Sequence, residues 1–124
     1  MFKFKKKINI PNSINQLNNC CFEECSNLSK INIPNSVTKL GKRCFYNCIS
    51  LINIIIPNSV KELGEDCFIL CSNLKETITL NSVKEISIMY FGYYSNLSKI
   101  ITSININIEK NCYGCLNLKK IKYN

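Results

Sequence analysis

The sequence has no histidine, no tryptophan and a single arginine among its 124 residues. Without histidine, it cannot contain a Ser-His or Cys-His nucleophile pair, an imidazole general base or a histidine-ligated zinc site. No acid–base pair or phosphate-binding loop is visible either. The sequence therefore predicts a protein that is not an enzyme and that carries no cofactor.

Long apolar segments are missing as well. The N-terminal stretch MFKFKKKINIPNS carries lysines but lacks the apolar run of about 7–15 residues that a secretory signal requires. No segment approaches the ~20 apolar residues of a membrane-spanning helix. As written, the sequence is expected to be soluble and cytoplasmic, in a reducing compartment, unless it is a piece of a longer exported protein.

What the sequence does contain is a regular internal repeat. Segments of equal length beginning at Ile8, Ile31 and Ile54 read INIPNSINQLNNCCFEECSNLSK, INIPNSVTKLGKRCFYNCISLIN and IIIPNSVKELGEDCFILCSNLKE. A fourth unit, 77–99, and a degenerate fifth, 100–124, keep parts of the pattern. Residues 1–7 look like the tail of a preceding unit. A fixed period of this size predicts one solenoid array over 1–124, of about five coils.

Each unit predicts two short strands and a turn. The spacing Leu-x-x-Ile-x-Ile at 28–33 is typical of a strand with one buried face, and 37–40 (Val-x-x-Leu) predicts a second extended piece. Pro-Asn-Ser at 34–36 ends the first strand, because proline lacks the donor that a ladder needs. Gly41 is expected to form a corner at positive φ, and 44–48 (Cys-Phe-Tyr-Asn-Cys) a single helical or 3₁₀ turn.

Stacked copies about 4.8 Å apart would place equivalent apolar side chains over one another. The expected pairs are Ile31 over Ile54, Val37 over Val60, Leu40 over Leu63, Phe45 over Phe68 and Leu51 over Leu74. One unit cannot bury this face alone, whereas three or more can. The predicted fold class is a mostly β solenoid with a parallel sheet on one face and short helical or 3₁₀ turns on the other.

The pattern Leu-x-x-Ile-x-Ile-Pro, then Val-x-x-Leu-Gly-x-x-Cys-Phe-x-x-Cys, resembles the BspA-like (Treponema-type) leucine-rich repeat. The family pattern is Cys-x-x-Leu-x-x-Ile-x-Leu-Pro, then Leu-x-x-Ile-Gly-x-x-Ala-Phe-x-x-Cys. Residues 25–48 match it almost one for one, with Cys44 in place of alanine, a variant similar to copies in amoebic protists. The match is strong over 8–76 and weaker beyond. The resemblance implies a leucine-rich-repeat fold in surface-associated or secreted proteins that adhere to host proteins, matrix proteins or neighbouring cells.

Six of the nine cysteines occupy two repeat positions, and three lie outside them. The first position holds Cys21, Cys44 and Cys67, the second holds Cys25, Cys48 and Cys71, and the others are Cys20, Cys112 and Cys115. The simplest interpretation is two ladders of small buried side chains. Disulfides between neighbouring coils stay open if the chain is exported, since stacked Cα atoms would lie within ~4.4–6.8 Å. A four-thiolate zinc site is a third alternative, although Cys-x-x-x-Cys is not the usual spacing.

The fourth unit replaces both ladder cysteines with Tyr90 and Tyr94, which are too large for close-packed cysteine positions. They are expected either to bulge outward, with hydroxyls at solvent or backbone, or to form an aromatic contact patch with Tyr93. Asn-Leu-Ser at 27–29 and 96–98 matches the glycosylation sequon. We interpret both as repeat residues that could carry glycans only after export.

The net charge of +8 is distributed unevenly over the repeat. On the predicted strand side, one acid (Glu76) accompanies ten lysines: Lys3, Lys5, Lys6, Lys7, Lys30, Lys75, Lys99, Lys119, Lys120 and Lys122. On the turn side, seven acids (Glu23, Glu24, Glu62, Glu65, Asp66, Glu85, Glu109) outnumber six bases (Lys39, Lys42, Arg43, Lys61, Lys84, Lys110). The strand-side excess either keeps a sheet face soluble and its edges unpaired or forms a contact surface for an acidic partner.

The functional interpretation is a basic contact face with an apolar centre. The candidate partner-binding residues are Lys30, Ile52, Ile55, Lys75, Lys99, Ile101, Lys119, Lys120 and Lys122. This mixture suits a protein partner, in an adhesin-like or scaffold role, because nucleic-acid surfaces usually interleave arginine and aromatic residues with lysine. Electrostatic binding to nucleic acid or an anionic membrane is the alternative. Both ends lack polar capping units, so we also expect a longer parent chain or end-to-end self-association.

Overall fold

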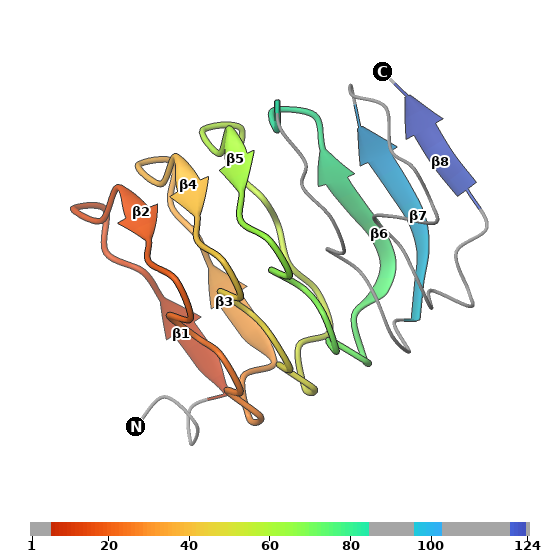
Figure 1. Ribbon diagram of the computed structural model, residues 1–124, viewed down its shortest axis with the longest axis horizontal. Helices are drawn as coiled ribbons and strands as arrows, with labels where there is room; N and C mark the ends of the chain where they lie inside the picture. Colours follow the sequence, from red (N-terminus) through yellow and green to blue (C-terminus); the bar gives the residue numbers. More distant parts are fainter. Residues whose placement is uncertain (1–5, 85–95, 103–119, 124) are drawn as a thin grey trace.

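The computed structural model describes residues 6–84, 96–102 and 120–123, and these residues follow a stack of coils along the longest axis of the molecule (Figure 1). They form short strands joined by tight turns, and no helix occurs among them. The strands are β1 (Lys7–Asn9), β2 (Gln16–Leu17), β3 (Lys30–Asn32), β4 (Lys39–Leu40), β5 (Glu62–Leu63), β6 (Lys75–Leu80), β7 (Asn96–Thr102) and β8 (Lys120–Tyr123). The solenoid predicted from the repeat period is therefore present.

Parallel pairing joins equivalent segments of successive coils. β1 pairs with β3, with Lys7 opposite Lys30. β2, β4 and β5 form a second ladder, in which Leu17, Leu40 and Leu63 lie in line. Partners in these two ladders are separated by one full repeat, as the sequence predicts, and Lys7 occupies the position of Lys30 in the preceding coil.

The third sheet, β6–β7–β8, follows a shorter offset. Ile78 lies opposite Ile100, and Ile100 opposite Ile121, after a register irregularity between Glu76 and Thr77. β6 has six residues, whereas β1 and β3 have three. Its last residue, Leu80, occupies the proline position of the first three coils. Because leucine retains the backbone N–H that proline lacks, the strand can extend as far as this position.

The third coil interrupts the first ladder, because residues 53–56 form no strand. Single backbone bonds still bridge the gap. The Ile52 N–H donates to the Ser29 carbonyl at 3.3 Å, and the Lys75 N–H donates to the Ile52 carbonyl at 2.9 Å. The predicted parallel sheet is thus divided into β1–β3 and β6–β7–β8, with the third coil lying between them.

The core consists of columns of equivalent side chains. Phe22, Phe45 and Phe68 stack with ring centroids 5.6 Å apart at each step and planes within 10° and 5° of parallel. Phe45 and Phe68 are fully buried, so the predicted Phe45–Phe68 pair is confirmed. The other predicted pairs are all buried as well: Ile31 and Ile54, Val37 and Val60, Leu40 and Leu63, Leu51 and Leu74.

The corner at 41–48 is a run of tight turns, and the expected helical or 3₁₀ turn is not formed. Alternate N–H groups point in different directions: those of Cys44 and Tyr46 donate three residues back, and that of Phe45 donates to the Cys67 carbonyl in the next coil. Arg43 and Asn47 have positive φ (55° and 57°), which breaks the repeating dihedrals of a helix. The corner therefore directs alternate donors to the neighbouring coil.

Gly41 is required for a close approach between coils and does not adopt positive φ, contrary to the sequence-based expectation. A Cβ at Gly41 would lie 2.6 Å from the Asn18 carbonyl carbon, and one at Gly64 would lie 2.2 Å from the Lys42 nitrogen. In each of the first three coils, the left-handed positions belong instead to non-glycine residues: Cys20, Glu24, Arg43, Asn47, Asp66 and Leu70.

The Gly64→Ala substitution should lower the free energy of unfolding by about 3 kcal/mol, because the methyl group would push two packed backbones apart. Glu24→Gly is the matched control, since Glu24 is exposed at φ 59°, where glycine is not strained. We expect this control to change stability by less than about 1 kcal/mol. Urea unfolding of both variants provides the measurement, and a Gly64→Ala protein as stable as the parent would contradict the close approach.

Candidate functional site

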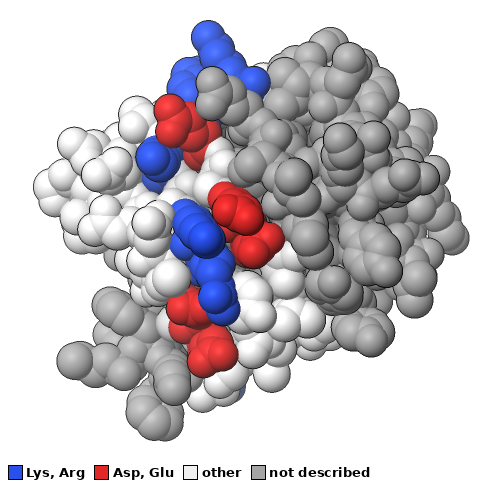
Figure 2. All heavy atoms as spheres, viewed as in Figure 1, with Lys and Arg blue, Asp and Glu red and all other residues white. Residues whose placement is uncertain are grey.

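Three ion pairs join neighbouring coils through charged side chains of the turn side, the side that also contains the short strands β4 and β5. The pairs are Lys39–Glu62 (3.6 Å), Lys42–Glu65 (3.7 Å) and Arg43–Glu23 (2.7 Å). The Arg43 guanidinium also lies 3.9 Å from the centroid of the Tyr46 ring. On the face seen in Figure 2, Lys and Arg alternate with Asp and Glu along one band. This band leaves little net charge for a partner to recognise.

The strand-side lysines have no such partners. Lys6, Lys7, Lys30 and Lys75 are exposed and Lys99 is half-buried. No ion pair involves any of them within the part of the chain that the structure describes. On the turn side, the described acids and bases balance in number, so the net positive charge of the described part lies on the strand side.

The remaining candidate residues fall into three groups. Ile52 and Ile55 are exposed, at 41% and 82%, and Ile101 is half-buried in β7. Lys119 lies outside the described residues. Lys120 and Lys122 lie in β8, where the structure describes their backbone but not their side chains.

Ile55 marks a departure from the repeat. Its counterparts one and two coils earlier are Asn32 and Asn9, and the Asn32 Nδ2 donates to the Asn9 Oδ1 at 2.6 Å. An isoleucine cannot extend this amide ladder, so its side chain stands free at the surface. The ladder ends where the third coil lacks a strand.

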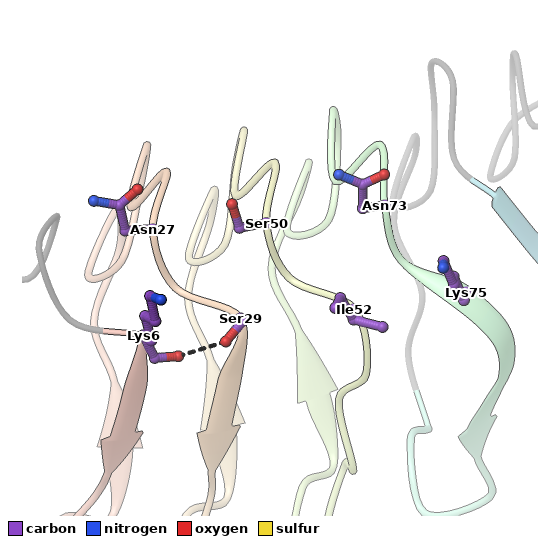
Figure 3. A pocket seen from close by; sticks show the side chains of 7 residues that line it. All are labelled: Lys6, Asn27, Ser29, Ser50, Ile52, Asn73 and Lys75. Atoms are coloured by element: carbon purple, nitrogen blue, oxygen red, sulfur yellow. Dashed lines mark hydrogen bonds between the residues drawn. The ribbon is translucent and has the colours of Figure 1, made fainter.

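A groove of about 520 Å³ crosses four coils on the strand side (Figure 3). Two rows of equivalent residues line it, each with one residue per coil. The first row is Lys6, Ser29, Ile52 and Lys75, and the second is Asn27, Ser50 and Asn73. A lysine stands at each end of the first row, and small polar side chains and one isoleucine lie between them.

Hydrogen bonds between coils hold the groove in shape. The Ser29 N–H and Oγ both donate to the Lys6 carbonyl at 2.9 Å, and the dashed line in Figure 3 marks the second of these bonds. The Ser50 Oγ donates to the Ser26 carbonyl, and the Asn73 Nδ2 donates to the Ile49 carbonyl at 2.7 Å. The lining is therefore formed before any ligand arrives.

A second recess of about 300 Å³ adjoins this groove. It lies between β3 and the strandless third coil and is lined by Ser29, Lys30, Ile31, Asn32, Ile52, Asn53 and Ile55. The two hollows share Ser29 and Ile52. Lys30, Ile52, Ile55 and Lys75, which the sequence predicted as one surface, thus line two adjoining hollows.

A comparison with models of known protein families identifies the family of this chain. The model for the BspA type leucine rich repeat region (6 copies) matches residues 2–119. The chain belongs to the BspA-type leucine-rich repeat family. The resemblance carried by residues 25–48 is therefore confirmed, and so is the leucine-rich-repeat fold class.

Solved leucine-rich repeat proteins share this BspA-type fold. The T. pallidum protein TpLRR is 25% identical with a TM-score of 0.80, over 94% of this chain and 56% of that one. A Bacteroides ovatus protein is 31% identical with a TM-score of 0.81, over 96% and 31%. A Eubacterium ventriosum protein, at 23% identity and a TM-score of 0.71 over 95% and 32%, supports the fold alone.

The BspA-type chain therefore spans between about a third and a little over half of the length of these solved proteins. No curated protein sequence matches it. In the described part of the chain, no helix has the length and apolarity needed to cross a bilayer.

Five of the six cysteines at the two repeat positions lie in the core, and Cys21 is the exception. None of the described cysteines forms a disulfide. Those at 20 and 21 are exposed, and those at 25, 44, 48, 67 and 71 are buried. The Cys48 S–H donates to the Phe22 carbonyl and the Cys71 S–H to the Phe45 carbonyl, both at 3.0 Å. Within the described residues, no disulfide joins them and no cluster of potential ligands could hold a metal ion.

Burial raises the pKa of three of these thiols, Cys44, Cys48 and Cys71. Desolvation raises the pKa of Cys48 to about 12 and raises that of Cys71 well above its usual value. A hydrogen bond with Cys67, together with burial, raises the pKa of Cys44. Because the thiolate is the nucleophilic form, these three side chains are poor nucleophiles at neutral pH.

Several groove residues were missed by the sequence prediction. Lys6, Asn27, Ser29, Ser50 and Asn73 line the groove but were not candidates for it. The signal was available, because stepping along the chain by one repeat from Lys6 or Asn27 generates each row. The tyrosines Tyr90, Tyr93 and Tyr94 lie outside the described residues. Asn27, of the first sequon, is exposed at the groove.

The raised thiol pKa values predict a loss of stability at alkaline pH. Thiols in the unfolded chain ionise near pH 9, whereas the raised-pKa thiols of the folded protein stay protonated. Their contribution to the free energy of unfolding is therefore complete below pH 9 and is lost as pH rises toward 12. The thiols of Cys44, Cys48 and Cys71 should each lower the free energy of unfolding by about 1.4 kcal/mol per pH unit in this range.

Urea unfolding between pH 8 and pH 11 measures this slope. The Cys48→Ala variant removes one titrating thiol. Its free energy of unfolding should therefore fall less steeply with pH, by about 1.4 kcal/mol per pH unit. A slope that is identical in the variant and the parent protein would contradict the assignment.

Proposed function

We propose that this chain is a non-catalytic module that binds an acidic or mixed protein partner through its basic strand face, in an adhesin-like or scaffold role. Leucine-rich repeat proteins generally act as protein-interaction modules. The observation that carries the proposal is a contrast between two sides. On the turn side, acids and bases nearly balance and form three ion pairs, whereas Lys30 and Lys75 form no ion pair within the described part of the chain and flank exposed isoleucines.

The exposed isoleucines would supply most of the affinity. Ile55 is 82% exposed beside a recess of about 300 Å³. Burying an isoleucine side chain against a partner is worth about 1.5–3 kcal/mol. The surrounding lysines would mainly speed association and reject basic partners, because charges on the rim of an interface steer encounter more than they add affinity. An apolar centre with a charged rim is the usual anatomy of a protein interface.

The position of the single arginine favours a protein partner over nucleic acid. Arg43 lies on the turn side, where it pairs with Glu23 and stacks on Tyr46. The groove and the recess on the strand face are lined by lysines without the arginine and aromatic residues that usually bind bases. Nucleic acid or an anionic membrane remains the alternative to be measured.

A displayed peptide library selected on the protein tests this function. Selected peptides should combine Asp or Glu with an apolar residue. The double variant Lys30→Ser, Ile55→Ser should bind them at least tenfold more weakly, because it removes the central apolar contact and one rim charge. The matched control is Lys61→Ser, Ile49→Ser, since Ile49 is 43% exposed and neither residue lines the groove or the recess. It should retain binding.

Duplex DNA and vesicles containing anionic lipid are measured alongside as competing ligands. A loss of peptide binding in the control pair would contradict the assignment of the strand face. Tight binding to DNA or vesicles that falls steeply with salt would support the electrostatic alternative instead.

A further inference from the structure

We infer that the groove holds an extended acidic segment of a partner protein, which lies along the solenoid axis and places two carboxylates four residues apart on Lys6 and Lys75. This inference rests on the proposed function and specifies the partner chemistry. It is carried by the two rows of equivalent residues that Figure 3 displays side by side.

The spacing of the two lysines sets the spacing of the acids. Lys6 and Lys75 occupy the same position in the first and fourth of four successive coils. Three steps of about 4.8 Å place their backbones about 14 Å apart. In an extended peptide, residues i and i+4 point to the same side and lie about 13 Å apart. One acid can therefore meet each lysine while the peptide stays extended.

The middle of the row defines the residue between the acids. Ile52 is 41% exposed between Ser29 and Lys75, and it borders the adjoining recess. Residue i+2 of the ligand points to the same side as both acids and reaches this middle region. An apolar side chain there would cover Ile52, so the segment reads acidic-x-apolar-x-acidic.

The second row can hold the backbone of the ligand. The exposed Asn27 amide makes no hydrogen bond within the described part of the chain, and it offers both a donor and an acceptor. Asn73 uses its Nδ2 on the Ile49 carbonyl, which leaves its Oδ1 as an acceptor. Among the residues that the structure describes, no acidic side chain lines the groove, which favours a carboxylate there.

The test compares two blocked synthetic peptides of equal composition and charge. The first is Gly-Ser-Asp-Thr-Val-Thr-Asp-Ser-Gly, and the second carries the two aspartates next to each other. Binding is measured at low ionic strength, and a carbodiimide then joins carboxylates to nearby lysines for mapping by mass spectrometry. The first peptide should bind about threefold more tightly and should form products with both Lys6 and Lys75.

Charge-removing variants locate the contact. Lys6→Gln and Lys75→Gln should each weaken the first peptide about threefold, to the level of the second peptide. Lys61→Gln is the control, because Lys61 is exposed on the turn side and lies outside the groove. It should leave the affinity of both peptides unchanged. Thermal unfolding of each variant establishes that it is folded.

Three results would overturn the inference: equal affinity for the two peptides, cross-links confined to lysines outside the groove, or tighter groove binding by a uronic-acid oligosaccharide of equal charge. If acidic peptides still depend on Ile55 and Lys30 but not on Lys6 and Lys75, the inference fails and the proposed function stands. If neither synthetic peptide binds and the library yields no strand-face ligand, both fail.

Discussion

Each coil of this protein is held by bonds that only a neighbouring coil can form. The N–H groups of Cys20, Phe22 and Glu24 donate to carbonyls of the second coil, the strands pair in parallel, and the phenylalanine rings stack at 5.6 Å. A single coil has no partner for these donors and no covered apolar face. The missing Cβ of Gly64 and the cysteine bonds to phenylalanine carbonyls follow from this close contact between coils.

The same repetition builds the surface. Because each position recurs once per coil, a surface residue becomes a row, and the chemistry of a row changes only where the sequence departs from its repeat. Ile55 ends a ladder of asparagines, and Ile52 interrupts a row of lysine and serine. Both departures fall in the third coil, where the first ladder of strands is broken. The candidate site is therefore located where the repeat is least regular.

The repeat period was enough to predict the stacking of coils, the buried columns and the second strand at Leu40. It could not predict the corner, because positive φ is adopted there by Arg43, Asn47 and other residues that rarely favour it. Local spacing suggested a helical turn at 44–48, and bonds to the next coil overrode it. The groove does not follow from the apolar and cysteine positions of the repeat, because its two rows begin at the polar residues Lys6 and Asn27.

The direct test of the stacking is the set of contacts between phenylalanine rings in solution. In protein with labelled phenylalanine, nuclear Overhauser effects should join Phe45 to both Phe22 and Phe68, since those centroids are 5.6 Å apart. No effect should join Phe22 to Phe68, which are two coils apart. Effects from Phe45 to neither ring, or from Phe22 directly to Phe68, would contradict a stack in which each repeat forms one coil.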